Sequence, residues 1–147
     1  MAKLKVIILF SAIFLIIFTL HLFGYFKGLY YSLHFYDKIL HLSAGAYISA
    51  IIIWVLFKTK IGDTLKTGNR FTKLILTIAL TITIGALWEF LEFFWDSYFA
   101  NKFGLPPLQI NNTDTILDLI FDTIGTILTV GSYYLITSKS KLFKRFF

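Results

Sequence analysis

The sequence predicts an all-α polytopic membrane protein, a bundle of four transmembrane helices, on the evidence of its composition and its long apolar runs. Of 147 residues, 57% are hydrophobic and only 15% are charged, and the mean hydropathy is +0.76. A soluble domain has about 25% charged and about 45–50% apolar residues, so this excess of apolar surface requires lipid. The length is that of one domain, and we expect residues 1–147 to form a single integral membrane domain.

The first two apolar runs are long enough to cross a bilayer unaided. A bilayer core about 30 Å thick needs a helix of about 20 apolar residues. Residues 6–26 contain no charged residue in 21 positions, and residues 39–57 contain none in 19. Each run therefore predicts one membrane span.

The two later runs reach the same length only by including acids. Residues 74–88 and 123–138 are free of charge over 15 and 16 positions. A full span has to extend the third helix past Glu89 and Glu92, and to begin the fourth helix before Asp118. The four expected helices cover approximately residues 4–26, 37–57, 71–97 and 114–137.

The loop between the third and fourth helices, residues 98–113, is the best candidate for a lid or rim. It contains Pro106-Pro107 and ends at Thr113-Asp114, a pair that we expect to cap the fourth helix.

The distribution of Lys and Arg predicts that both termini are cytoplasmic. Eleven of these residues fall on one side of the expected membrane and three on the other. The eleven are Lys3, Lys5, Lys58, Lys60, Lys66, Arg70, Lys73, Lys139, Lys141, Lys144 and Arg145, and the three are Lys27, Lys38 and Lys102. We expect a protein integral to the plasma (inner) membrane. This asymmetry explains the formal charge of +6, so membrane lipids are the expected partners and nucleic acid is not.

Seven of the eight acids lie at the outer ends of helices two, three and four. Their spacing is helical, so each set makes one stripe on one helix face. The stripes are Asp37 with His41, then Glu89, Glu92 and Asp96, then Asp114, Asp118 and Asp122. From the helical rise, Glu89 and Asp122 both lie roughly 10–12 Å below the outer boundary. Three stripes at matching depth predict one shared pocket.

We predict a polar site made by one histidine and five acids. They are Asp37, His41, Glu89, Glu92, Asp118 and Asp122, with Asp96, Asp114 and His34 as secondary members. An acid at the centre of a membrane helix costs about 2.5–3.5 kcal/mol, so these groups must be buried together or around water. Asp37 and Asp114 also suit the positive end of a helix dipole, and Asp96 suits a solvated helix end.

Three arrangements would neutralise the inner acids, and the sequence leaves all three open. The acids bind a metal, they share protons, or they pair with Lys38, His34 and His41. If a metal binds, its ligands come from His41, Glu89, Glu92, Asp118 and Asp122. Carboxylate oxygens with an imidazole suit a divalent cation, namely Mg²⁺, Mn²⁺, Ca²⁺ or Zn²⁺.

Several other residues have simpler explanations. Three glycines lie on the same helix faces as the acids, namely Gly45, Gly85 and Gly125. Their small size predicts close packing of the helices. We expect His21 to make a packing contact rather than to act as a metal ligand. No cysteine nucleophile or Ser-His-Asp order is present, so no catalytic residue is assigned and enzymatic activity stays open.

Three motifs carry a family resemblance. They read Asp37-Lys38-Ile39-Leu40-His41 followed by Gly45, then Leu87-Trp88-Glu89-Phe90-Leu91-Glu92, then Asp118-x-x-x-Asp122-x-x-Gly125. The pattern resembles the VanZ-like membrane proteins and the related YjdF-type inner-membrane proteins, which are small bundles with a D-K/R-x-x-H signature and a helix-borne acid pair. VanZ-like chains often have Asn where Asp122 stands, and YjdF-type chains usually have Trp-Asp where this one has Leu117-Asp118.

The resemblance implies a bacterial-type protein of the cell envelope and supplies no reaction. VanZ-like proteins are associated with resistance to glycopeptides (teicoplanin), and YjdF-type proteins have no assigned biochemical activity. By position, the family's polar residues match Asp37, His41, Glu89, Glu92, Asp118 and Asp122.

Three functions are compatible with the sequence. The first is a membrane enzyme or binder whose metal–carboxylate site holds or hydrolyses a lipid-linked or amphiphilic envelope substrate. The second is an ion- or proton-coupled transport component that uses the same acids. The third is a non-catalytic envelope or resistance factor. The inner helix halves offer hydroxyls and no acids, which favours the first over the second.

Overall fold

The computed structural model consists of helices and connecting loops, with no strand in the ranges it describes, residues 2–33, 35–64, 69–109 and 111–146. Side chains are described for 3–33, 35–63, 69–109 and 111–138. The long helices are α1 (Ala2–Lys27), α3 (Tyr36–Lys58), α5 (Arg70–Trp95) and α7 (Asn112–Phe146). The short elements are α2 (Leu29–Ser32), α4 (Lys60–Thr64), the π-helix η1 (Asp96–Ala100) and α6 (Asn101–Phe103). Four helices are long and apolar enough to cross a membrane, which confirms the predicted class.

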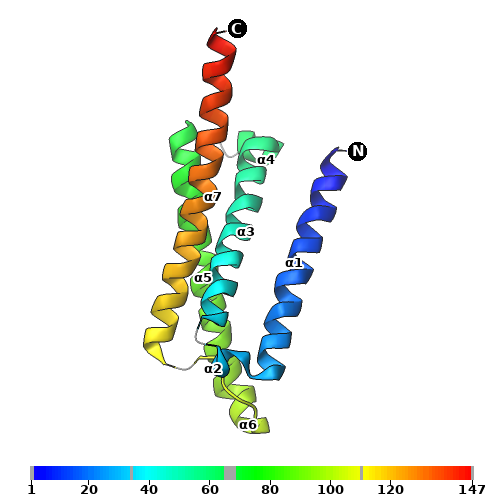
Figure 1. Cartoon of the computed structure of the whole chain (residues 1–147), viewed down its shortest axis with the longest axis vertical. Helices are drawn as coiled ribbons and strands as arrows, with labels where there is room; N and C mark the ends of the chain where they lie inside the picture. Colours follow the sequence, from blue (N-terminus) through cyan, green and yellow to red (C-terminus); the bar gives the residue numbers. More distant parts are fainter. Residues whose placement is uncertain (1, 34, 65–68, 110, 147) are drawn as a thin grey trace.

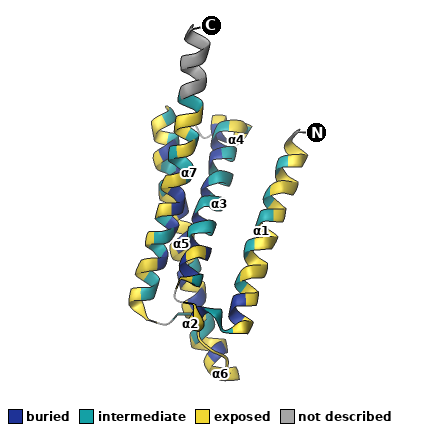
Figure 2. Cartoon of the chain, viewed as in Figure 1, coloured by how far each residue is buried: buried dark blue, intermediate teal, exposed yellow. Residues whose placement is uncertain are grey.

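Helices α3, α5 and α7 pack together, and α1 stands beside them (Figure 1). Both termini and α4 lie at one end of the molecule, which we call the basic end, and α2 and α6 lie at the other, which we call the acidic end. No residue in the most hydrophobic stretch of α1 is buried, against one third in α3 (Figure 2). The core is therefore the three-helix unit of α3, α5 and α7.

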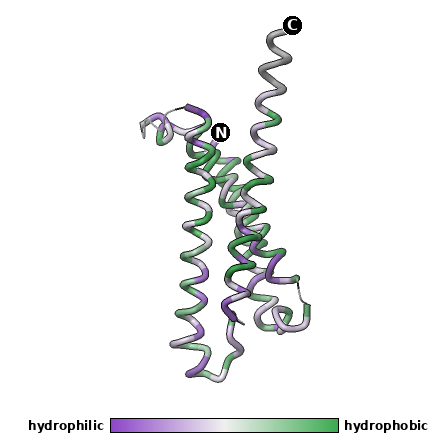
Figure 3. Tube along the Cα trace, turned by 90° about the vertical axis from the view of Figure 1, so that its left-hand side faces the viewer, coloured by the Kyte–Doolittle hydropathy of each residue, from purple (hydrophilic) through white to green (hydrophobic). Residues whose placement is uncertain are grey.

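The interior of this unit is more polar than its surface. Among the described residues of α3, α5 and α7, the least exposed side chains are all polar, namely Ser49, Thr77, Thr81, Asp118 and Thr126. The outward faces are lined by exposed Leu, Ile and Phe, and hydrophobic residues dominate the middle of the long helices (Figure 3). A soluble protein shows the reverse order, so this distribution is that of a bundle surrounded by lipid.

Glycines let α3 and α7 approach closely. A Cβ atom on Gly45 would lie 2.7 Å from Asp122 Cα, and one on Gly125 would lie 2.8 Å from the Ala46 nitrogen. Thr126 Oγ1 also donates to the Gly45 carbonyl over 3.4 Å. The predicted packing role of Gly45 and Gly125 is confirmed.

Two helix boundaries at the acidic end differ from the prediction. The third helix continues as η1 and α6 to Phe103, so the predicted loop 98–113 begins as helix. It stops at Gly104, whose φ of 63° only glycine adopts readily. Asn111, not the predicted Thr113, caps α7, because its Oδ1 accepts from the Thr113 and Asp114 amides at 2.9 and 3.1 Å. The cap prediction was wrong because an Asx turn begins two residues earlier.

Basic side chains at the other end bind backbone carbonyls. Lys73 Nζ donates to the Leu56 carbonyl at 2.8 Å, and Arg70 donates to the Tyr134 carbonyl at 3.2 Å and to Thr137. The Lys73 bond satisfies a carbonyl in the last turn of α3, and the Arg70 bonds join the start of α5 to α7.

Candidate functional site

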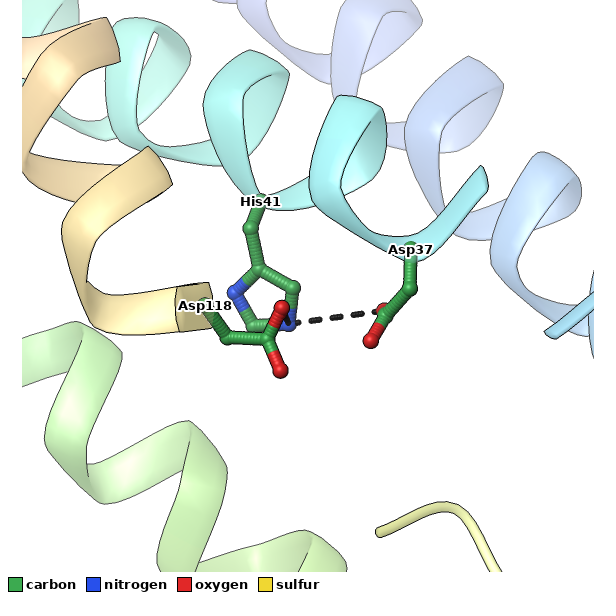
Figure 4. Close-up of side chains that lie close together, drawn as sticks. All are labelled: Asp37, His41 and Asp118. Carbon is green, nitrogen blue, oxygen red and sulfur yellow. Dashed lines mark ion pairs between the residues drawn. The ribbon is translucent and has the colours of Figure 1, made fainter. Parts of the chain in front are cut away.

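His41 occupies the centre of a carboxylate cluster built by all three core helices. Its Nε2 lies 3.6 Å from Asp37 Oδ1, 3.6 Å from Glu89 Oε1 and 3.9 Å from Asp118 Oδ1. Its Nδ1 lies 3.3 Å from Asp122 Oδ2, which accepts a hydrogen bond. Figure 4 shows His41, Asp37 and Asp118 converging from α3 and α7. One imidazole thus contacts four acids.

Lys38 pairs with a second group of acids beside His41. Its Nζ lies 2.8 Å from Asp118 Oδ1 and 3.3 Å from Asp37 Oδ2, and it also pairs with Asp114. Lys38 itself is buried. Of the three arrangements that the sequence left open, the pairing of acids with Lys38 and His41 is therefore present, and it joins the start of α3 to the start of α7.

Glu89 has one carboxylate oxygen that is hydrogen-bonded and one that is not. Gln109 Nε2 donates to Glu89 Oε2 at 3.1 Å and lies equally far from Thr115 Oγ1. The other oxygen, Oε1, is buried and has no hydrogen-bond partner among the described residues. A buried carboxylate oxygen without a donor is costly, and this atom has the free lone pairs to accept a proton or to bind a cation.

Glu92 and Asp96 continue the α5 stripe and take different roles. Glu92 is buried and accepts from Trp88 Nε1 at 2.8 Å. Asp96 accepts from the Leu108 and Gln109 amides at 2.7 and 2.8 Å. Asp96 therefore fastens the loop that covers the acidic end.

The narrowest part of the cluster surrounds Asp122. A Cβ on Gly85 would lie 2.5 Å from Asp122 Oδ2, so only glycine at this position of α5 leaves room for the carboxylate. The prediction of Gly85 as a simple helix-packing notch is refined accordingly: the space it leaves is filled by an acid.

Two groups of side chains offer ligand atoms close enough for one metal ion. They are Asp37, His41 and Asp118, and His41, Glu89 and Glu92, and within each group the atoms lie within 4.8 Å of one another. The two groups share His41, so they describe two positions around one imidazole. Both sets combine carboxylate oxygens with one nitrogen, a donor set that suits a divalent cation.

Two cavities lie between α1 and the core, on either side of the contact between His21 and Trp88. The first, of about 270 Å³, has apolar walls from α1, α3 and α5 and reaches Asp37, His41 and Asp122. The second, of about 370 Å³, reaches Glu92. The His21 and Trp88 rings meet edge to face with centroids 5.3 Å apart, as predicted for a packing histidine.

Tyr30 closes the acidic end of the first cavity. Its hydroxyl lies 2.6 Å from His21 Nδ1, and burial raises the pKa of Tyr30 far above its usual value. The phenol therefore stays protonated and can donate this hydrogen bond.

The structure brings most of the predicted residues together. Asp37, His41, Glu89, Glu92, Asp114, Asp118 and Asp122 meet in one cluster. Asp96 lies apart from it and binds the loop, and His34 and Lys66 fall outside the described residues. Sequence reasoning missed Gln109, which is the one long amide side chain in the loop before α7.

Comparison with known families agrees with a membrane location. The family model described as "Predicted membrane protein (DUF2238)" matches residues 1–139. The chain belongs to this family. The DUF2238 match covers all four candidate spans and every residue of the cluster. No match was found among curated proteins or among solved structures.

Proposed function

We propose that this membrane protein binds a divalent cation in the carboxylate–histidine cluster and uses that centre to hold an amphiphilic or lipid-linked substrate of the cell envelope. The observation that carries the proposal is Glu89 Oε1, which is buried without a hydrogen-bond partner among the described residues and lies 3.6 Å from His41 Nε2. A cation there would complete the bonding of this oxygen.

The charge of the cluster supports the same proposal. Six carboxylates face one lysine, and each unneutralised acid within a bilayer costs about 2.5–3.5 kcal/mol at the helix centre. Ligands from His41, Glu89, Glu92, Asp118 and Asp122 favour Mg²⁺, Mn²⁺ or Ca²⁺, with Zn²⁺ as the ion that would depend most on the imidazole. Hydrolysis by a metal-activated water is the reaction class open to such a donor set.

The resemblance seen in the sequence motifs supports a role in the cell envelope. The D-K-x-x-H sequence at Asp37, the acid pair at Glu89 and the Asp118-x-x-x-Asp122 stripe resemble the VanZ-like and YjdF-type proteins. On this basis we place the chain in the plasma (inner) membrane with both termini in the cytoplasm, with the acidic end outward. A non-catalytic resistance factor would use the same site for binding alone.

Transport is a weaker explanation because, among the described residues, no continuous path for ions or protons leads from the cluster to the basic end. The buried hydroxyls of Thr77, Thr81 and Thr126 each donate to a carbonyl of their own helix four residues back, at 2.8 to 2.9 Å, and Thr126 shares its proton with the more distant Gly45 carbonyl. A proton relay needs each hydroxyl to donate to the next group along the path, and these donors are already committed.

The test is metal analysis of the detergent-purified protein, followed by thermal unfolding with and without chelator. At a hundredfold excess over Kd, a ligand of the folded state adds about 2.7 kcal/mol, or roughly 5–10 °C in Tm for a chain of this size. We expect Glu89→Gln and Asp122→Asn to abolish this increase and Asp63→Asn, in α4 at the basic end, to retain it. If the Tm of the wild-type protein does not respond to metal but changes with pH, shared protons hold the cluster together and the cation proposal fails.

A further inference from the structure

We infer that the cavity between α1, α3 and α5 binds the hydrocarbon chain of a cationic amphiphile, whose ammonium head group lies against Asp37 and Asp122. This inference rests on the proposed function, because it names the substrate class of that same site.

The walls of the cavity are apolar along most of its length. They include Phe14 and Phe18 of α1, Ala44 and Ile48 of α3, and Ile84 and Leu87 of α5. Its volume of about 270 Å³ lies just below the range of about 300–1,000 Å³ usual for small-molecule sites. A space of this size and lining fits a single hydrocarbon chain and is too small for a bulky polar molecule.

The cavity opens on the surface that faces lipid. Phe14, Leu87 and Leu91 line it and are 50%, 58% and 56% exposed, so its mouth lies between α1 and α5. Helix α1 makes few buried contacts and is held to α3 by Tyr36 and Tyr47, whose hydroxyls donate to the Leu20 and Phe10 carbonyls at 2.6 and 2.9 Å. A chain can therefore enter sideways from the bilayer without passing through water.

The polar end distinguishes this cavity from an ordinary gap filled by lipid. It is formed by Asp37, His41 and Asp122, all at most 9% exposed. An apolar channel that ends on buried carboxylates matches a molecule with an apolar tail and a polar head.

Charge decides the kind of head group. Six carboxylates and Lys38 give the cluster a formal charge of −5 with His41 neutral or −4 with His41 protonated, and a bound divalent cation would still leave −3 or −2. An anionic head group would meet net repulsion in either state, whereas an ammonium group can pair with Asp37 and Asp122 directly. The ligand is therefore an amphiphile with a cationic head and one hydrocarbon chain.

The test uses the full chain in phosphatidylcholine nanodiscs and the fluorescence of Trp88, which lines the cavity. The Trp54→Phe/Trp95→Phe variant leaves Trp88 as the sole tryptophan. The probes are dodecylammonium, dodecanol and dodecanoate, each brominated on the same carbon to quench Trp88 and added at equal mole fraction in the membrane. We expect saturable quenching by the ammonium probe at concentrations at least several-fold lower than for the other two.

Two sets of variants separate the polar end from the apolar walls. Asp37→Asn and Asp122→Asn keep the side-chain shape, and each should raise the midpoint for the ammonium probe about tenfold while leaving dodecanol unchanged. Ala44→Phe fills the cavity and should remove saturable quenching by every probe. The control is Ile39→Phe. Ile39 is 61% exposed on the lipid-facing side of α3, so this substitution should leave the quenching by all three probes unchanged.

Two outcomes would overturn the inference. If the three probes quench Trp88 of the wild type equally, or if they quench Trp88 of Ala44→Phe as strongly as that of the wild type, the cavity holds ordinary bilayer lipid. All arms are run with chelator and with Mg²⁺, alongside the thermal measurements. Stabilisation by metal without preference for ammonium refutes the amphiphile site and keeps the cation centre, whereas ammonium binding without any metal response keeps the site and refutes the centre.

Discussion

Asp122 is the residue on which most of the cluster's geometry depends. Two glycines from different helices surround it, Gly45 against its backbone and Gly85 against its carboxylate. The carboxylate in turn binds His41 Nδ1, which leaves Nε2 facing the other acids. Small residues on α3 and α5 therefore fix where the acid of α7 lies, and the acid fixes how the imidazole is used.

Substituting these glycines should separate packing from binding. In Gly45→Ala the new methyl meets backbone, which cannot move aside, so we expect a loss of about 1–3 kcal/mol in stability. In Gly85→Ala it meets the end of a flexible side chain, so the bundle should stay folded while the response to metal is lost. Thermal unfolding with and without metal measures both effects.

Gly131→Ala is the matched control, because nothing lies within 4 Å of the position where its Cβ would be. It should be neutral or add up to about 1 kcal/mol. Equal behaviour of all three variants would show that the glycines do not shape the cluster.

At the scale of elements, the loop between α6 and α7 is fastened to the helices on both sides. Asp96 accepts from two loop amides, Gln109 reaches Glu89, and the hydroxyls of Tyr25 and Tyr31 donate to the Pro106 and Pro107 carbonyls. Because Gln109 belongs to the loop and its side chain contacts both α5 and α7, movement of the loop would change the bonding of the cluster.

We expect Asp96→Ala to loosen this loop without unfolding the bundle. It removes two hydrogen bonds to a carboxylate, each worth about 1.5–3 kcal/mol. Hydrogen exchange of the Leu108 and Gln109 amides should accelerate by at least about a hundredfold, while the amides of α3 keep their protection. Asp63→Ala, at the basic end, serves as the control, and unchanged exchange at Leu108 would show that Asp96 does not hold the loop.

The periodic parts of the chain were predictable and the aperiodic parts were not. Hydropathy over about 20 residues located the four helices, and the helical spacing of Asp118 and Asp122 placed them on one face. The helix ends depend on single residues, Gly104 and Asn111, whose backbone conformation no pattern reports. Gln109 was missed for the same reason, since a loop has no period from which the direction of a side chain follows.

At the scale of the whole molecule, the two ends differ in charge. Both termini and α4 share the basic end (Figure 1). The seven clustered and loop-binding acids belong to the first turns of α3 and α7, the last turns of α5, and η1, all toward the acidic end. By the distribution of Lys and Arg, the basic end should face the cytoplasm.

Thiol labelling on intact cells can test this orientation, because the chain has no cysteine of its own. We expect Asn112→Cys, at the start of α7, to react with a membrane-impermeant reagent, and Ser140→Cys to react only after lysis. Labelling of Ser140→Cys before lysis would show that the orientation is the reverse.

Neutralising Lys58, Lys60 and Arg70 together should disturb this orientation and leave metal binding by correctly inserted molecules unchanged.

The close contact of α3 and α7 at Gly45 and Gly125 has an electrical consequence. Moving one elementary charge across the whole membrane potential changes its energy by about 2.3 kcal/mol per 100 mV. The glycine contact leaves little space for water between these two helices on the basic side of Asp122, so most of the potential should fall across that packed region. A cation that reaches His41 from the acidic end would then cross only a small part of the field. Occupancy of the cluster should consequently vary little between energised and depolarised membranes.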